Sequence, residues 1–141
     1  MTYPHTTAIS PHDRALATRG LADTLGITLL EFTPERVVAT MPVDERTRQP
    51  FGILHGGASL ALAETVASLG ALANVDRSRF DTVGIEINAN HVRAKSDGVV
   101  TGTATPIHVG RTTQVWDVRI VDERGRAVCV SRCTLAVRPR E

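Results

Sequence analysis

Residues 55–73 form an almost continuous apolar run with one acidic side chain, Glu64, near its middle. Alanine and leucine dominate this run, so we predict a helix of about four to five turns. Apolar residues occupy every side of that helix, which indicates that it is buried nearly all round. Burying an unpaired carboxylate costs several kcal/mol. Glu64 therefore needs partners, such as Thr65, Ser68 or backbone amides, or a function that uses its charge.

Turn residues divide the remainder of the chain. Ser10 and Pro11 suit an N-cap and a first helical position, so a short helix is expected through about Leu25, with Gly26 as its stop. Strands are expected near residues 27–32, 36–43, 82–95, 99–109, 112–122 and 127–138, with a loop over 44–54. The short connections between the last strands favour antiparallel pairing.

These elements predict a fold class. An antiparallel sheet of this size can curl around one long helix, which explains why that helix is apolar on all faces. We expect an N-terminal segment, residues 1–25, followed by one α+β domain, residues 26–141. Such a sheet leaves an edge strand, so dimerisation through sheet edges is expected.

Composition excludes several classes of function. The chain is 42% apolar and 22% charged, as in ordinary globular proteins. A net charge of +1 and only five aromatic residues argue against a nucleic-acid groove. No uninterrupted apolar run is long enough for a bilayer and the N-terminus resembles no signal peptide, so we expect a cytoplasmic protein. Arginine outnumbers lysine 15 to 1, which suits phosphate binding, although a preference for arginine codons explains most of such a ratio.

No metal site or disulfide is expected. Cys129 and Cys133 lie four residues apart in one predicted strand, which separates their Cα atoms by about 13 Å, too far for a disulfide. The histidines are scattered and form no metal-binding spacing: His5, His12, His55, His91 and His108. We therefore expect chemistry without a metal or another cofactor.

The start of the long helix is a candidate oxyanion site. Gly56 and Gly57 leave backbone N–H groups uncovered by side chains at a helix N-terminus, which also has a partial positive charge. The same glycines would equally allow close helix–sheet contact. His55 is a candidate acid, base or donor, or simply a capping residue. Gln49 could donate to a carbonyl oxygen, or bond only to loop backbone.

Glu64 and Ser68 are four residues apart, and so share one helical face. Gly57 lies on nearly the same line, one to two turns earlier. A ligand could therefore pass the small residues and meet both polar groups.

Several blocks of the sequence carry a family resemblance. They are residues 49–58 (QPFGILHGGA), 63–65 (AET), 83–93 (VGIEINANHVR), 110–116 (GRTTQVW) and the segment from Asp122 to Val137. Together they resemble the hotdog-fold acyl-CoA thioesterases, in the branch of the phenylacetate-pathway and 4-hydroxybenzoyl-CoA thioesterases. The blocks are most similar to 1,4-dihydroxy-2-naphthoyl-CoA hydrolases of menaquinone biosynthesis and to the related thioesterase that clears misloaded aryl carrier proteins. The resemblance covers residues 26–138.

The resemblance implies roles for the candidate residues. Glu64 matches the catalytic carboxylate, which acts as a nucleophile or as a general base on water. Gly56 matches the residue whose N–H polarises the thioester carbonyl, His55 and Gln49 match residues that position this carbonyl, and Ser68 matches a hydroxyl residue that assists. In the family the site forms across a homodimer, with Glu64 facing the Gly56 of the partner subunit, and a dimer of dimers is the expected assembly.

Coenzyme A contacts are also implied. The matching positions are His91, Arg93, His108, Gly110, Arg111, Thr112, Thr113 and Arg138. The arginines suit the phosphates of coenzyme A, although each would equally fit a solvated strand end.

The expected function is hydrolysis of an aromatic acyl-CoA to the free acid and CoA. The likeness to naphthoyl and benzoyl thioesterases favours a planar aromatic acyl group, by analogy alone. Two alternatives stay open: a hydroxyacyl dehydratase on the same scaffold, and a non-catalytic acyl-CoA sensor or carrier. The Gly-Gly–helix–Glu arrangement argues against the first, and the lack of a DNA-binding or second domain against the second.

Overall fold

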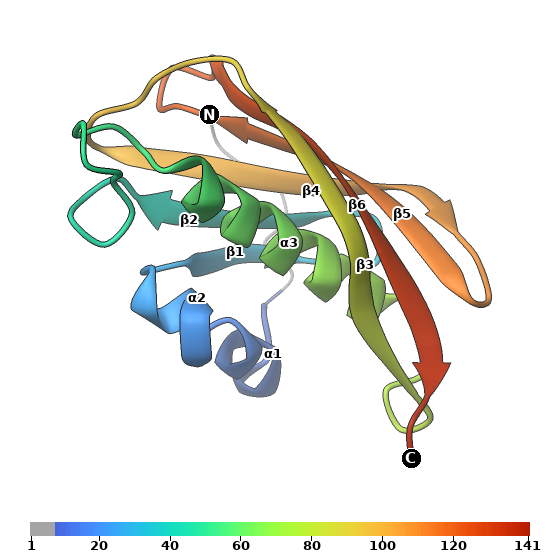
Figure 1. Ribbon diagram of the computed structural model, residues 1–141. Coiled ribbons are helices and arrows are strands. Elements are labelled where there is room, and N and C mark those ends of the chain that lie inside the picture. The colour runs from blue at the N-terminus through green and yellow to red at the C-terminus, as the bar shows by residue number, and fades with distance from the viewer. Residues whose placement is uncertain (1–7) are drawn as a thin grey trace.

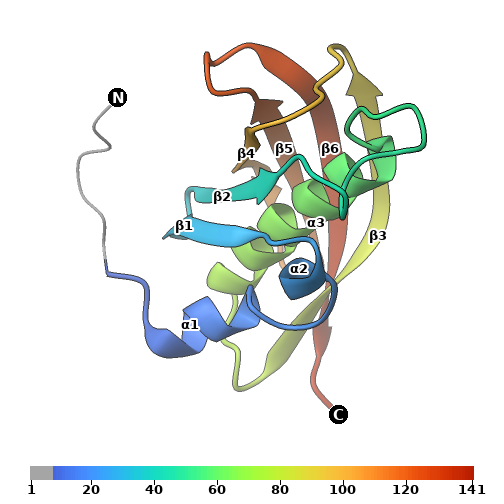
Figure 2. The same ribbon diagram turned by 90° about the vertical axis from the view of Figure 1, so that its left-hand side faces the viewer.

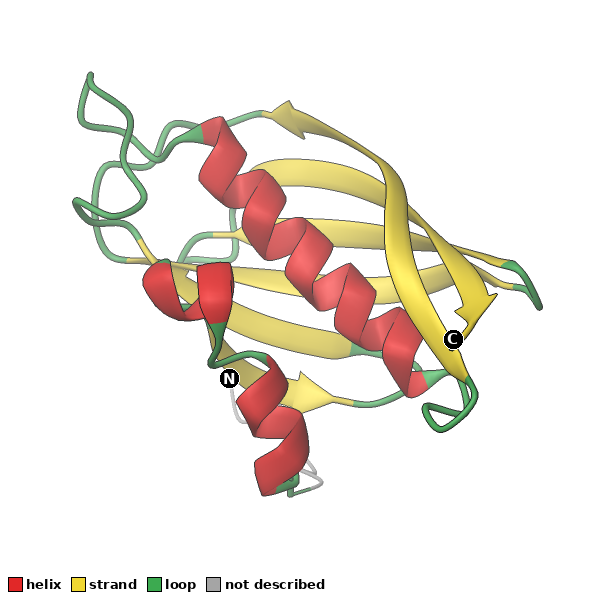
Figure 3. Cartoon of the chain, turned by 60° about the horizontal axis from the view of Figure 1, so that its bottom comes forward, coloured by secondary structure: helices red, strands yellow, loops and turns green. Residues whose placement is uncertain are grey.

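One long helix lies in the concave face of a curved six-stranded antiparallel sheet (Figures 1 and 3). The structure is a computed structural model and describes residues 8–141. Its elements are α1 (Pro11–Leu16), α2 (Gly20–Thr24), β1 (Thr28–Phe32), β2 (Val37–Pro42), α3 (Gly56–Ala73), β3 (Phe80–His91), β4 (Val99–Val109), β5 (Thr113–Val121) and β6 (Ala127–Pro139). The strand order is β1-β2-β4-β5-β6-β3, so β1 and β3 are the two edges. The predicted helix wrapped by an antiparallel sheet is confirmed.

Two predicted boundaries are wrong. The single N-terminal helix is two short helices: α1 ends at Leu16, and the chain is extended at Arg19 (φ −131°, ψ 154°) before α2 begins at Gly20. The strand predicted over 82–95 begins earlier and ends at His91. Beyond this strand Lys95 belongs to a loop, where its carbonyl accepts a hydrogen bond from the Leu54 N–H at 2.7 Å. The first seven residues of the expected N-terminal segment lie outside the described residues.

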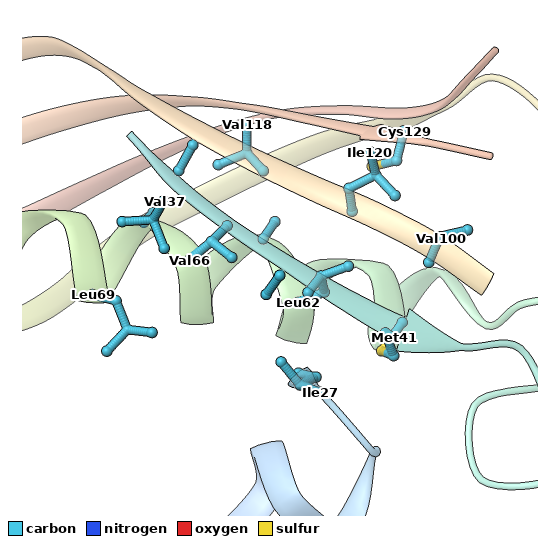
Figure 4. Packing of buried hydrophobic residues seen from close by; sticks show 14 of the residues in the cluster. Ile27, Val37, Met41, Leu62, Val66, Leu69, Val100, Val118, Ile120 and Cys129 are labelled. Atoms are coloured by element: carbon cyan, nitrogen blue, oxygen red, sulfur yellow. The ribbon is translucent and has the colours of Figure 1, made fainter. Parts of the chain in front are cut away.

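The core forms where α3 packs on the sheet (Figure 4). Leu62 and Val66 of α3 are fully buried against strand residues such as Val118 and Ile120. Trp116 is also fully buried, and its ring crosses α3 at Gly70, where a Cβ would lie only 2.5 Å from the ring. Small residues on α3 therefore set how closely the helix approaches the sheet.

A buried polar chain fixes the same contact. The Trp116 Nε1–H donates to Gln114 Oε1 at 3.0 Å, and Gln114 Nε2 donates to the carbonyl of Ala71 at 3.2 Å. Gln114 is completely buried, so these bonds satisfy groups that water cannot reach. They connect β5 directly to the last turn of α3.

The expectation that α3 is buried on all sides is wrong for the single chain. Nine of its 18 residues are buried, but Glu64 is exposed. The sheet covers one side of α3 and the short helices α1 and α2 cover only part of the other (Figure 2). By length and composition alone α3 could also span a membrane, but half of it is buried inside the protein, as in the core helix of a globular fold.

An ion pair holds the β3–β4 loop, to which the loop before α3 is attached. Lys95 Nζ lies 2.9 Å from Glu123 Oε2, and Glu123 also accepts a hydrogen bond from the Val99 N–H at 2.8 Å. The bond from Lys95, followed by the bond from the Val99 N–H, lowers the pKa of Glu123 to about 2. Arg48 Nε donates to the carbonyl of Ser96 at 2.8 Å, so residues 48–54 are attached to the same loop.

Gly70→Ala should destabilise the protein by about 2 kcal/mol, because the new methyl group overlaps the buried Trp116 ring. At an exposed helical position the same change stabilises by about 1 kcal/mol. Urea unfolding measures the difference. On a Trp116→Phe background, the smaller ring should reduce the cost of Gly70→Ala. An equal cost on both backgrounds would show that Trp116 does not limit the packing.

The Lys95–Glu123 pair should make stability fall in acid. The folded pKa of Glu123 is below its ordinary value of 4.5, so its contribution is complete above that value and is lost as the pH falls toward about 2. Lys95→Met should therefore destabilise the protein more at pH 7 than at pH 2 in urea unfolding. Arg119→Met, which removes an exposed ion pair to Asp117, is the control. A pH-independent effect of Lys95→Met would contradict this assignment.

Candidate functional site

The N-terminus of α3 presents one free backbone donor. His55 is the N-cap, and its Nδ1 accepts the Gly57 N–H at 2.7 Å. Of the two glycine N–H groups that the sequence suggested, only that of Gly56 lacks a hydrogen-bond partner among residues 8–141. The capping role expected as the alternative for His55 is therefore present. It occupies only Nδ1 and leaves Nε2 available.

A pocket of about 380 Å³ lies beside Gly56. Four predicted site residues line it together: Gln49, Gly56, His91 and Arg93. Ser59, which was not predicted, lines it as well. The His91 ring lies so close to Gly56 that a Cβ there would be 2.7 Å from His91 Nε2. A side chain at position 56 would therefore require the His91 ring to move.

Gln49 is half-buried in the loop before α3. Its Oε1 accepts the N–H of Phe51, so the alternative of a glutamine that bonds loop backbone is also present. Its Nε2 has no hydrogen-bond partner in the described part of the chain. This amide can donate to an oxygen atom in the pocket, as the resemblance implies.

Glu64 lies in a different groove, of about 370 Å³. The groove separates α3 from the N-terminal helices. It is lined by Ala61, Glu64, Thr65, Ser68 and Leu69 on one side and by Leu16, Arg19, Leu21 and Ala22 on the other. The Thr65 hydroxyl donates to the carbonyl of Ala61 at 2.6 Å, whereas the Ser68 hydroxyl has no partner among the described residues. The Glu64 carboxylate lies against Gly84 of the edge strand β3.

Gly56 and Glu64 of one chain do not face each other. They are eight residues apart on α3, which corresponds to about 12 Å along the helix axis. His55 lines a third groove, with Gly57 and Ala61, that shares Leu21 and Ala61 with the groove of Glu64. A single thioester carbonyl therefore cannot meet the Gly56 N–H and the Glu64 carboxylate of the same chain.

The predicted coenzyme A contacts also divide into two sets. His91 and Arg93 line the Gly56 pocket. The β4–β5 turn, with Gly110, Arg111, Thr112 and Thr113, lies at the opposite end of the sheet (Figure 1). Strand β6 runs between the two ends: its Cys129 pairs with His91, and its Ala136 pairs with Thr113. Cys129 and Ala136 are about 23 Å apart along β6.

The predicted coenzyme A contacts at the β4–β5 turn lie close together. The His108 ring packs against Gly110, and the carbonyl of Thr112 accepts the N–H of Val137. Arg138 follows directly on β6. Arg111 and Arg138 are exposed and form no ion pair among residues 8–141. They are therefore free to bind an anion.

Cysteine chemistry is excluded at neutral pH. Burial raises the pKa of Cys129, and burial together with the nearby carboxylates of Glu64 and Glu86 raises the pKa of Cys133 to about 12. Both thiols stay protonated and are poor nucleophiles. Within residues 8–141 no group of histidine, cysteine and acidic side chains could hold a metal ion.

Sequence reasoning missed the contribution of the N-terminal helices and of Gly84. Gly84 lies in a strand-like run and offers no side chain, but only glycine leaves room for the Glu64 carboxylate. Leu16, Arg19 and Leu21 lie in the segment without a recognisable motif. Their spacing at the end of one helix and the start of another was the only available signal.

The comparisons with known proteins identify the class. The thioesterase superfamily matches residues 51–129, more than half of the chain, so the protein belongs to this superfamily. It is a hotdog-fold thioester hydrolase, as the resemblance predicted.

Two relatives and one solved structure make the similarity more specific. A 1,4-dihydroxy-2-naphthoyl-CoA hydrolase of Listeria monocytogenes is 45% identical over 86% of this chain and 98% of its own length. The proofreading thioesterase EntH of Cronobacter turicensis is 49% identical over 83% of this chain and 85% of its own. A crystal structure of a mutant thioesterase PA1618 of Pseudomonas aeruginosa has a TM-score of 0.89 and 43% identity, covering 98% of this chain and 99% of that one.

The two roles of His55 can be separated by substitution. His55→Asn keeps an N-cap acceptor and should preserve stability, but without the imidazole it should lower thioesterase kcat/KM at least about tenfold. His55→Ala should lose the same activity and also about 1 kcal/mol of stability. Thermal unfolding and thiol release measure the two effects. Full activity in His55→Asn would reduce His55 to a cap.

Proposed function

We propose that the protein hydrolyses an aromatic acyl-CoA in a site formed by two copies of the chain. The observation that supports this most directly is the separation of the open Gly56 N–H from Glu64 within one chain. Both groups suit thioester hydrolysis, but each lies in a groove that lacks the other. A second copy could supply the missing half.

The edge strand β3 offers the surface for that second copy. It has 12 residues, and its outer edge has no neighbouring strand. Val83, Ile85 and Val92 on or next to it are 36%, 61% and 56% exposed. A long, apolar, unpaired edge is a template for pairing with another chain. The strand itself contains the Gly84 that contacts Glu64 and the His91 that contacts Gly56.

One register would unite the two halves. If β3 paired antiparallel with its copy about a twofold axis at Asn88, Gly84 would lie opposite the partner subunit's His91, because the bulge between Gly84 and Glu86 shifts the register by one residue. The partner subunit's Gly56, which touches that His91, would then lie beside Glu64. In the same register Asp81, the β3 neighbour of Arg138, would lie opposite the partner subunit's Ala94.

That register would also unite the coenzyme A contacts. Arg138 and the turn with Arg111, Thr112 and Thr113 would approach the pocket of His91 and Arg93 in the other subunit. Three arginines would then converge on one groove mouth, which suits the phosphates of coenzyme A. His108 and Gly110 would shape the turn that contacts the pantetheine arm.

The chemistry follows from this arrangement. The Gly56 N–H, at the positive end of α3, would donate to the thioester oxygen as negative charge develops on it. Gln49 Nε2 and His55 Nε2 would orient the same oxygen. Glu64 would either take a proton from water, with Ser68 holding that water, or attack the carbonyl carbon itself. On the first route water forms the new C–O bond as the C–S bond breaks, and the proton that Glu64 took passes to the CoA thiolate. On the second route Glu64 forms a mixed anhydride as the C–S bond breaks, the CoA thiolate takes a proton from solvent, and water then hydrolyses the anhydride to release the acid and restore Glu64.

The relatives support the finer assignments. The Listeria relative is named for a naphthoyl-CoA substrate, and EntH is named for proofreading. We propose an aromatic acyl group, such as a dihydroxynaphthoyl or benzoyl group, with aryl carrier-protein thioesters as further substrates. We also propose a cytoplasmic location, a dimer of dimers as the assembly, a role in menaquinone biosynthesis and no cofactor requirement.

Thiol release from a panel of aromatic and aliphatic acyl-CoAs tests this function. Glu64→Gln and Glu64→Ala should lower kcat by at least about 1000-fold, because both remove the base or nucleophile. Ser68→Ala should lower it less. Aromatic thioesters should react faster than aliphatic ones. Binding of acyl-CoA without turnover by the wild type would indicate a sensor or carrier, and hydration of an enoyl-CoA would indicate a dehydratase.

A pair of substitutions isolates the Gly56 N–H. Gly56→Ala and Gly56→Pro both place a Cβ against His91, but only proline removes the N–H. Proline suits the first position of a helix, so α3 should persist. Gly56→Pro should lower kcat about 100-fold relative to Gly56→Ala. Equal activity of the two variants, with normal circular dichroism, would remove this N–H from the mechanism.

A further inference from the structure

The groove at Glu64 contains one charged side chain that the mechanism does not use. Arg19 lies between α1 and α2 and lines the groove together with Glu64 and Ser68. It is exposed and forms no hydrogen bond or ion pair among residues 8–141, Glu64 included. Arg19 and Glu64 line the same groove without bonding to each other, so a ligand that binds in this groove could contact both side chains.

The position of Arg19 along the groove follows from the path of the N-terminal helices. Asp13 of α1 pairs with Arg77, just beyond the end of α3. Leu25, after α2, lines the neighbouring groove of His55 and Gly57, at the start of α3. The segment therefore runs opposite to α3, as Figures 2 and 3 show. Arg19 falls between these ends in sequence and lines the groove together with Ser68 and Leu69.

The groove has the composition of an acyl pocket with one polar end. Leu16, Leu21, Ala22, Ala61 and Leu69 provide apolar walls, and Leu21 is 64% exposed toward solvent. Ser68 is one helical turn, about 6 Å, beyond Glu64. A six-membered ring whose thioester carbon lies at Glu64 would span that turn and bring its far substituent to the level of Arg19.

We propose that Arg19 is a specificity-determining residue that binds an oxygen substituent, an anionic one most strongly, on the part of the acyl group farthest from the thioester. This inference rests on the proposed function, because it takes the groove at Glu64 as the acyl site. Arginine suits the role, since its planar guanidinium donates paired, charge-assisted hydrogen bonds to carboxylate or phenolate oxygens. Arg19 lies in the N-terminal segment, outside residues 51–129, the part that matches the superfamily model.

Three thioesters with the same ring test the proposal: benzoyl-CoA, 4-hydroxybenzoyl-CoA and 4-carboxybenzoyl-CoA. The wild type should have the highest kcat/KM for the carboxylated ring and the lowest for the unsubstituted one. Arg19→Met keeps the length and the apolar stem but removes the charge. It should lower the 4-carboxybenzoyl to benzoyl ratio of kcat/KM at least tenfold, mainly through KM, and change benzoyl-CoA hydrolysis less than twofold.

Two further variants are controls. Arg14→Met removes an exposed arginine of α1 that does not line the groove, and should leave the ratio unchanged. Arg19→Lys keeps the charge and should restore part of the ratio. An unchanged ratio in Arg19→Met, or an equal loss for all three thioesters, would overturn the role of Arg19 while Glu64-dependent hydrolysis of benzoyl-CoA upholds the proposed function. If the wild type hydrolyses none of these thioesters and no aliphatic one, the proposed function fails as well.

Discussion

The close approach of α3 to the sheet is the constraint on which the rest of the structure depends. Gly70 admits the Trp116 ring, and Gln114 bonds that ring to the end of α3, so the helix cannot rotate or slide. Because its rotation is fixed, Glu64 points away from the core and toward β3. Gly84 then leaves space for the carboxylate. One packing contact thus determines which part of the sheet Glu64, the proposed catalytic carboxylate, reaches.

The same geometry leaves the single chain with complementary but separate halves. The Gly56 pocket has the open Gly56 N–H, the proposed oxyanion donor, with Gln49 and His91, whereas the Glu64 groove has the carboxylate and Ser68. Both adjoin β3, a long unpaired edge with exposed apolar residues. Exposure of Glu64 in one chain is therefore compatible with a buried carboxylate in a dimer, where pairing of β3 would cover it. The N-terminal helices close the other side of the groove and supply Arg19.

Much of this was predictable from the sequence. Alternating strands, turn residues and a helix apolar on all faces predicted the architecture, and the Gly56–Gly57 pair and Glu64 were recognised as candidate reactive groups. The contact of Gly84 with Glu64 and the break between Leu16 and Gly20 were not predictable, because they depend on tertiary distances and backbone angles. The exposure of Glu64 was mispredicted for a related reason. An apolar helix face looks the same in sequence whether the chain itself or a second copy covers it.

Complementation between two inactive variants tests the central claim, that Glu64 of one chain acts with the Gly56 N–H of another. Glu64→Ala and Gly56→Pro would be unfolded together, refolded and assayed for thiol release. Random pairing makes roughly half of the dimers mixed, and each mixed dimer has one intact site of two, so about a quarter of wild-type activity should return. Failure to recover activity, with mixed dimers demonstrated by mass spectrometry, would place both groups in a site within one chain and contradict the account.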